Sequence, residues 1–144
     1  MTAKTHHSKH FSRCCVVQAL YQWQHVPDSA EKIIDQFKES DLLKQADRKY
    51  FKKLLIEILN HVKVIDDLFK PLLDRPIEDL TPVELAILRL AAYELAYCPE
   101  VPYKVAINEA LEIAKDYGAD QSHKYVNAIL DALSQKTRFH EKNT

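Results

Sequence analysis

The stretch 79–97 limits the fold more than any other part of the sequence. It is apolar on almost every side and is broken mainly by three charged residues, Glu84, Arg89 and Glu94. A helix that is apolar all round is wrapped by other helices rather than laid on a surface. The stretch is too short, and carries too many charges, to span a membrane. We therefore predict that residues 81–97 form the central helix of an all-α domain.

Both ends of this helix are marked in the sequence. Thr81 can cap the first amides, Pro82 suits the first helical position, and Glu84 can reach back to the amide of the capping residue. Two prolines follow shortly after residue 97, and proline cannot continue a helix because it lacks the backbone N–H. We expect most side chains of the helix to be core. Glu84 and Arg89 are the residues most available for another role.

The rest of the chain also favours helices. A single glycine, Gly118, argues against hairpins, glycine-rich phosphate loops and most sheets. Apolar residues at helical spacing predict a helix that starts at a cap formed by Ser8 or Ser12, runs to about residue 24 and has one apolar face. A short helix should follow a cap at Asp28.

The longest predicted helix starts at a cap formed by Asp47 and is ended or kinked by Pro71. It is long enough to bridge two lobes. Two more helices follow the central one, over residues 103–117 and from a cap at Asp120 or Ser122. We expect a polar, basic tail after the last of them. The predicted fold is therefore all-α, with about seven helices.

Charge is distributed unevenly, although the net charge of the 144-residue chain is only −1. No acidic residue precedes Arg13, whereas this N-terminal arm holds Lys4, Lys9 and three histidines. The arm lacks an apolar stripe, so we expect it to be mobile up to about Lys9 in the isolated protein. It also lacks the apolar core of a signal peptide, and three cysteines give no disulfide framework. We therefore expect a cytoplasmic protein.

Patterns typical of catalysis or metal binding are weak. His6, His7 and His10 are clustered, but the sequence fixes no thiolate or carboxylate beside them, and we expect no metal site. Cys14 and Cys15 precede apolar helix positions, where cysteines usually pack. We find neither a phosphate loop nor a hydrolase elbow. We therefore predict neither an enzyme nor a cofactor.

Nucleic-acid binding fits the residues better. The basic arm runs into a helix that offers Gln18 and Tyr21. The expected last helix begins with Gln121, Lys124 and Tyr125. Basic groups neutralise phosphates, and aromatic rings stack on bases. A basic terminus is also often only solvated, and both tyrosines could belong to the rim of the core, so the residues alone leave both interpretations open.

Four motifs, in order along the chain, resemble the NusB family of transcription antitermination factors. They are Ala19-Leu20-Tyr21-x-Trp23, Glu84-x-Ala-Ile-Leu-Arg-Leu-Ala-x-Tyr-Glu-Leu95, Val101-Pro-Tyr-Lys-Val-Ala-Ile-Asn-Glu-Ala110, and Ser122-His-Lys-Tyr-Val-Asn127 before Leu130-Asp131. The last two runs are long and specific, and the match covers nearly the whole chain.

The resemblance implies a single domain over 1–144, made of two small helical lobes that we place at about 8–73 and 77–135. It implies binding to the single-stranded boxA element of ribosomal RNA leader transcripts. The implied protein partner is NusE, a small-subunit ribosomal protein, within the antitermination complex of RNA polymerase. The resemblance implies no enzymatic activity, cofactor, metal or membrane.

Residues that match the family's contacts can be placed in this sequence. The implied RNA contacts are Lys4, Lys9, Arg13, Gln18, Tyr21, Gln121, Lys124 and Tyr125. The implied NusE contacts are Glu78 and Glu84. Acidic groups that face a basic ribosomal protein make electrostatic sense.

The arm departs from the family pattern, which is often rich in arginine. Here it reads Lys4-Thr-His-His-Ser-Lys-His10, with arginine only at Arg13. Lysine and neutral histidine cannot reproduce the planar fork of arginine, so we expect weak binding of RNA alone at neutral pH and a larger dependence on NusE.

Two alternatives belong to another functional class. The chain could be a helical adaptor that binds proteins only, with an incidental basic arm. It could also be a regulatory domain like the one fused to some ribosomal RNA cytosine methyltransferases. The chain ends at Thr144, too soon for a methyltransferase domain, which we take as an argument against the fused form.

Overall fold

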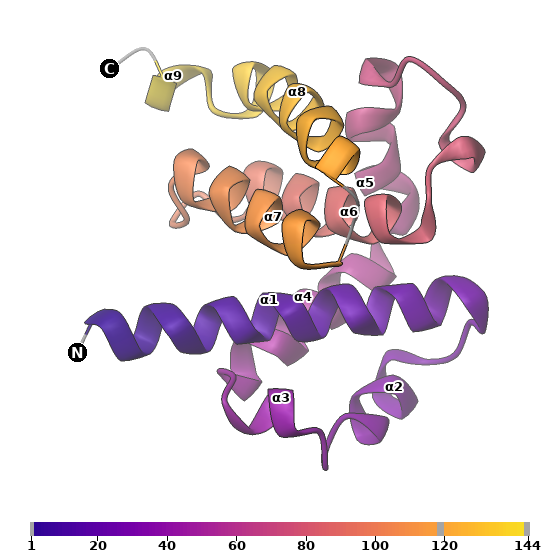
Figure 1. The fold of residues 1–144 in the computed structure, drawn as a ribbon, viewed down its shortest axis with the longest axis vertical. Helices are drawn as coiled ribbons and strands as arrows, with labels where there is room; N and C mark the ends of the chain where they lie inside the picture. Colours follow the sequence, from indigo (N-terminus) through magenta and orange to yellow (C-terminus); the bar gives the residue numbers. More distant parts are fainter. Residues whose placement is uncertain (1, 118–119, 143–144) are drawn as a thin grey trace. The chain divides into compact units, whose positions relative to one another are not determined.

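The computed structural model describes the backbone of residues 2–117 and 120–142, and the side chains of 7–117 and 121–142. Within these ranges it contains nine α-helices, two short 3-10 helices and no strand (Figure 1). The predicted all-α class is confirmed. None of the helices in the described part of the chain is both long and apolar enough to cross a membrane. The chain divides into two compact units, Met1–Asn60 and His61–Thr144.

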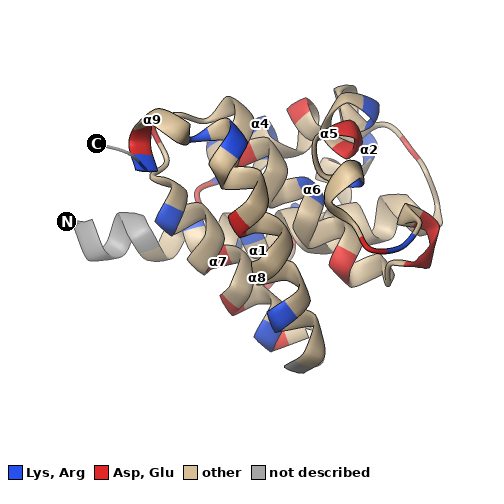
Figure 2. Cartoon of the chain, turned by 90° about the horizontal axis from the view of Figure 1, so that it is seen from above, with Lys and Arg blue, Asp and Glu red and all other residues tan. Residues whose placement is uncertain are grey.

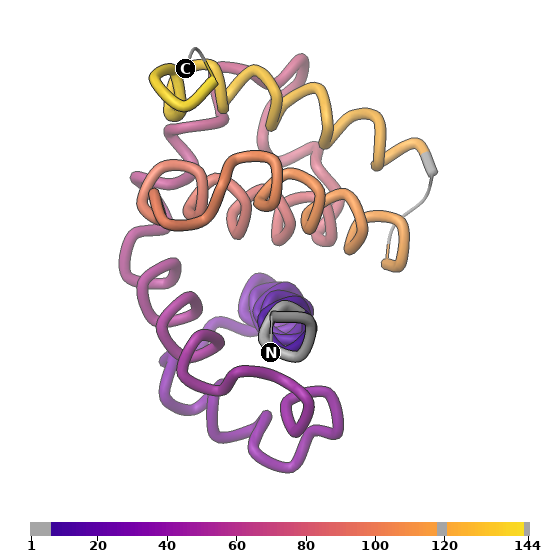
Figure 3. The backbone as a smooth tube through the Cα atoms, turned by 90° about the vertical axis from the view of Figure 1, so that its left-hand side faces the viewer, coloured from indigo at the N-terminus to yellow at the C-terminus, as the bar shows by residue number. Residues whose placement is uncertain are grey.

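The first unit is built around its N-terminal helix. It comprises α1 (Thr2–His25), α2 (Ala30–Gln36), α3 (Asp41–Lys44) and α4 (Arg48–Asn60). α1 contacts each of the other three helices, and Figure 3 shows α1 nearly end-on. The large side chains that fill this unit are fully or almost fully buried: Leu20, Ile33, Leu43, Phe51 and Leu54.

Asp47 joins the beginning of α4 to α1. Its carboxylate accepts a hydrogen bond from the Tyr50 amide at 3.1 Å, which is the cap expected from the sequence. The carbonyl of Asp47 accepts from the buried Ser12 hydroxyl at 2.7 Å, and its amide donates to the Ser8 carbonyl at 3.1 Å. The start of α4 is therefore fixed against α1 by both main-chain and side-chain hydrogen bonds.

Three details of the first unit differ from the sequence prediction. α1 begins at Thr2 rather than at Ser8 or Ser12, because no glycine or proline interrupts the first turns. Its residues 12–17 are all buried, so the helix is covered on more than one face. α2 is capped by Ser29, whose hydroxyl accepts from the Lys32 amide at 3.2 Å, rather than by Asp28.

The second unit surrounds the apolar helix that the sequence places at the centre. It comprises α5 (Val62–Phe69), η1 (Lys70–Leu72), η2 (Ile77–Asp79), α6 (Pro82–Tyr97), α7 (Tyr103–Tyr117), α8 (Asp120–Thr137) and α9 (Phe139–Lys142). α6 packs against α5, α7 and α8 (Figure 1). Every residue from 86 to 95 is buried, including Arg89 and Glu94. Residues on all sides of α6 are therefore enclosed, as its sequence predicts.

The beginning of α6 carries the predicted capping box. The Glu84 amide donates to the Thr81 hydroxyl at 3.1 Å, and the Thr81 amide donates to the Glu84 carboxylate at 3.0 Å. Pro82 occupies the first turn, where no intrahelical N–H bond is lost. Two orphan amides are thus satisfied reciprocally.

The long helix expected after Asp47 is divided. His61 has φ −132° and ψ 28°, outside helical values, and separates α4 from α5. α5 packs against α6, so residues 61–73 belong to the second unit rather than to the N-terminal lobe expected over 8–73. The apolar stripe continues across His61, and for that reason the sequence does not show this boundary.

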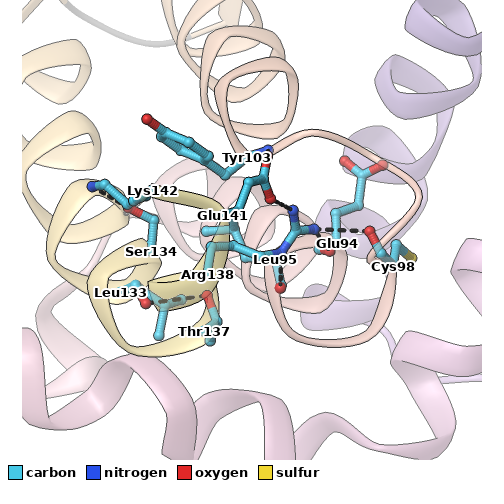
Figure 4. A network of polar contacts seen from close by, with 10 residues as sticks. All are labelled: Glu94, Leu95, Cys98, Tyr103, Leu133, Ser134, Thr137, Arg138, Glu141 and Lys142. Atoms are coloured by element: carbon cyan, nitrogen blue, oxygen red, sulfur yellow. Dashed lines mark hydrogen bonds and ion pairs between the residues drawn. The ribbon is translucent and has the colours of Figure 1, made fainter. Parts of the chain in front are cut away.

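The C-terminal segment, expected to be a polar, basic tail, forms the short helix α9, and the buried Arg138 before it contacts the end of α6 (Figure 4). This residue is only 6% exposed. Its guanidinium donates to the carbonyls of Leu95 at 2.8 Å, Glu94 at 3.1 Å and Cys98 at 2.8 Å. These carbonyls lie at the end of α6, where a helix leaves acceptors without intrahelical partners. Arg138 therefore caps the central helix.

Glu141 extends this network to the next helix. One carboxylate oxygen accepts from Arg138 at 2.6 Å, and the other accepts from the Tyr103 amide, at the beginning of α7, at 3.0 Å. The hydrogen bond from the Tyr103 amide lowers the pKa of Glu141 below its ordinary value, and the hydrogen bond from Arg138 lowers it further. Arg138 and Glu141 together connect the end of α6 with the start of α7.

Candidate nucleic-acid interface

Two of the predicted RNA contacts, Lys9 and Arg13, converge on Tyr50 in the first unit. The Lys9 ammonium lies 5.2 Å from the centre of the Tyr50 ring, and the Arg13 guanidinium carbon lies 5.5 Å from it. Arg13 also donates to the Tyr50 hydroxyl at 3.4 Å and is only 2% exposed. Arg13 is therefore an interior residue that ties α1 to α4, whereas Lys9 is partly exposed. The side chain of Lys4 lies outside the described residues.

The surface of α1 further along presents the two residues expected there. Gln18 is exposed, and Tyr21 is 43% exposed. The Tyr21 ring packs against His25, with the ring centres 4.4 Å apart. His25 also contacts the Tyr21 carbonyl through Nδ1 at 2.8 Å, which fixes the imidazole beside the phenol. Tyr21 is thus a braced surface aromatic, the type of residue on which a base can stack.

The first turns of α8 contain the other predicted contacts. Gln121 and Lys124 are exposed, whereas Tyr125 is partly buried. The hydroxyl oxygen of Tyr125 is itself buried. Burial of the phenol raises the pKa of Tyr125 above its ordinary value, and the Asp74 carboxylate raises it further. The hydroxyl of Tyr125 therefore faces the protein, and the ring forms part of the surface beside Lys124.

Arg75 covers the ring of Tyr125, which the sequence does not indicate. Its guanidinium carbon lies 4.4 Å from the ring centre, within the range of a cation–π contact. Arg75 is held from the other side by Asp74, through Nε–Oδ1 at 2.7 Å and Nη2–Oδ2 at 3.2 Å. The residues are fifty positions apart in the numbering, 75 and 125, so no local pattern could connect them.

The two acidic residues matched to a protein partner differ in exposure. Glu78 lies in η2 and is exposed. Glu84 is 8% exposed, and its second carboxylate oxygen accepts from the Ser122 hydroxyl at 2.9 Å. Because its first oxygen is in the capping box, Glu84 is engaged within the fold and links the start of α6 to the first turn of α8.

Other polar residues singled out in the sequence have structural contacts. Arg89, expected to be available, forms a largely buried bidentate pair with Asp66 of α5, with both N–O distances 2.9 Å. Asp67, the next residue, is exposed. Cys14 and Cys15 are buried, and burial raises the pKa of Cys15 to about 12. A thiol with that pKa stays protonated, which fits packing rather than nucleophilic chemistry.

The described charges of both signs are interspersed along the helices rather than gathered by sign (Figure 2). Attraction of a polyanion must therefore come from local groups such as Lys9, Lys124 and Arg75 rather than from the field of the whole molecule. Sequence reasoning identified the first two of these. Arg75 is not among the predicted contacts, because its position over Tyr125 depends on packing between residues far apart in the sequence.

Comparisons with known proteins give a consistent result. The NusB family matches residues 10–135. A transcription antitermination protein NusB of Coxiella burnetii (strain Dugway 5J108-111) is 48% identical over 131 residues, covering 91% of this chain and 95% of that protein. The protein of the same name from Tolumonas auensis is 47% identical and covers 85% of this chain and 88% of its own length. A solved structure of T. maritima NusB is similar with a TM-score of 0.79 and 31% identity, covering 88% of this chain and 89% of that one.

Proposed function

This chain belongs to the NusB family, and we propose that it is a transcription antitermination factor that binds the boxA element of ribosomal RNA leader transcripts as a single strand. Its relatives are named as transcription antitermination proteins rather than as enzymes. The observation that carries the proposal is the match over residues 10–135, which includes α1 from residue 10 onward and α8 up to residue 135. In this role the protein acts in the cytoplasm, with NusE, to help RNA polymerase read through terminators.

Residues of α1 and α8 support the RNA-binding part of the proposal. Lys9 and Lys124 supply charge for phosphates, and Gln18 and Gln121 supply exposed amides. Tyr21 offers an exposed ring. Arg13 is not assigned a phosphate contact, because its guanidinium is buried against Tyr50. The N-terminal arm carries lysines and histidines where the family often has arginines, so we expect the protein alone to bind RNA weakly.

The exposed residue Glu78 supports the part of the proposal that concerns NusE. We assign Glu78 the direct contact with this basic ribosomal protein. Glu84 contributes negative charge from below the surface and keeps the beginning of α6 in place. Binding of NusE beside the start of α6 would add a second source of affinity to the weak contacts with RNA.

A titration of boxA-containing RNA, with and without NusE, tests the proposal. We expect weak retention of this RNA by the protein alone and stronger retention with NusE, and a scrambled RNA of equal length is the control. Tyr21→Ala should weaken RNA binding by about 1–2 kcal/mol with little change in melting temperature, as for a stacking residue. Equal, negligible binding of both RNAs in the presence of bound NusE would support the adaptor alternative instead.

A further inference from the structure

Arg75 and Tyr125 form one surface feature of the second unit. The Tyr125 hydroxyl oxygen is buried, so this end of the ring faces the protein interior, while the guanidinium carbon of Arg75 lies 4.4 Å from the ring centre. The Arg75 side chain remains 42% exposed. A ligand that approaches the face of Tyr125 covered by this guanidinium meets Arg75 first.

The guanidinium is also held in a defined orientation. Asp74 accepts hydrogen bonds from two of the guanidinium nitrogens, and the guanidinium carbon lies 4.4 Å from the centre of the tyrosine ring. A planar guanidinium stacked on an aromatic ring can pair with a phosphate in a bidentate manner or stack on a base with its opposite face. The same arginine on a solvated loop would lose more side-chain entropy on binding.

We infer that Arg75 is an RNA-contacting residue of this protein, and that Tyr125 is the positioning residue that holds it beside the first turns of α8. The inference rests on the proposed function and changes the expected role of Tyr125 from a stacking surface to a support. Lys124, which immediately precedes Tyr125 in α8, is exposed, so Arg75 adds a second cation to this part of the surface. Single-stranded RNA, with phosphates and unstacked bases along one strand, is the ligand that fits this pair of groups.

Binding of the boxA RNA to the full-length chain over a range of salt concentrations tests the inference. Arg75→Ala should weaken binding severalfold and make the log–log salt slope shallower by about 0.7, the value for one phosphate contact on a single strand. Arg75→Lys should keep the slope but lose affinity, because lysine keeps the charge without the planar fork. Lys63→Ala, which removes one exposed charge at the start of α5, is the matched control and should leave the slope unchanged.

Variants of Tyr125 separate a supporting role from direct stacking. Tyr125→Phe keeps the ring and should bind RNA like the wild type. Tyr125→Ala should weaken binding, but adding it to Arg75→Ala should cause little further loss, because the two residues act through one contact. Melting temperatures of all variants identify any that fail to fold, in which case Arg75→Ala and Tyr125→Phe carry the test.

Two results would overturn the inference and one would overturn its premise. Unchanged or tighter binding by Arg75→Ala would mean that Arg75 only covers a ring that RNA uses directly. Additive losses in the double variant would mean that Tyr125 and Arg75 contact RNA independently. Absence of RNA binding by the wild type, with or without NusE, would instead contradict the proposed function itself.

Discussion

The end of α6 and the start of α8, both in the second unit, use an arginine–carboxylate pair in opposite ways. At the end of α6, Arg138 is 6% exposed and donates to three main-chain carbonyls in addition to Glu141. At the start of α8, Arg75 is paired with Asp74, but its side chain is 42% exposed and rests on a tyrosine ring. One arginine completes the fold, and the other remains on the surface.

The acceptors around each guanidinium account for this difference. Buried carbonyls at a helix end need donors, and a charged donor satisfies them more strongly than a neutral one. Arg138 therefore contributes to stability wherever α6 is folded. Arg75 has an exposed carboxylate partner, and an exposed ion pair contributes little to stability because water and salt screen it. Replacement of Arg75 should consequently cost little stability.

The largest expected effect is the loss of the buried arginine. Arg138→Ala should destabilise the protein by about 3–4 kcal/mol, because three buried carbonyls lose a charged donor. Arg75→Ala should change stability by well under about 1 kcal/mol. Urea unfolding of both variants measures the contrast, with Arg138→Lys as an intermediate control. Similar stabilities for Arg138→Ala and Arg75→Ala would remove the distinction between the two regions.

Arg13 in the first unit tests whether burial alone predicts if an arginine stabilises the fold or binds RNA. Its interaction with Tyr50 resembles that of Arg75 with Tyr125, but Arg13 is 2% exposed. Arg13→Ala should therefore cost about 2–3 kcal/mol of stability through lost packing and a lost hydrogen bond. RNA affinity, measured at a temperature where the variant is folded, should stay near that of the wild type. Full stability with greatly weakened RNA binding would show that Arg13 reaches the ligand.

The sequence predicted the helices of the fold better than it predicted which charged residues are buried and which are exposed. The apolar run over 79–97 and its capping box correctly indicate the central helix, because burial follows the local pattern of apolar residues. The break at His61 was not predictable, since apolar spacing continues through it. The helical C-terminal segment was also missed, because Arg138 acts on carbonyls about forty residues earlier in the chain.

For the candidate interface, four of the residues that the resemblance matches to RNA contacts are exposed: Gln18, Tyr21, Gln121 and Lys124. The sequence could not show that Arg13 lies inside, because a basic residue beside a basic arm has the same pattern whether it is buried or exposed. It also could not show that Arg75 lies over Tyr125, which depends on packing of the segment between η1 and η2 against α8. Contacts between distant residues, rather than residue types, decide which charges are available to a ligand.

Glu84 and Glu78 extend the comparison of buried and exposed charges to two carboxylates, with a smaller expected change in stability. Glu84→Ala should cost about 1–2 kcal/mol, since it removes the capping-box bond and the bond from Ser122. Glu78→Gln, at an exposed position, should leave stability unchanged and weaken NusE binding. Glu84→Gln is the control that can keep the cap. Thermal unfolding and a titration with NusE measure the two properties, and normal NusE binding by Glu78→Gln would contradict its assignment as the direct contact.

The smallest expected effect is a pH dependence at the buried arginine. Folding lowers the pKa of Glu141 below the ordinary value of 4.5, chiefly through the bond from the Tyr103 amide and then through Arg138. A carboxyl whose folded pKa is depressed contributes stability above its unfolded pKa and loses it as the pH falls through the folded pKa. Glu141→Gln should therefore be less stable than the wild type near neutral pH, and the difference in melting temperature should shrink as the pH falls below about 4.5. A difference that stays constant with pH would mean that Glu141 acts through its shape and neutral hydrogen bonds, and that the charge of Arg138 is balanced by the helix carbonyls alone.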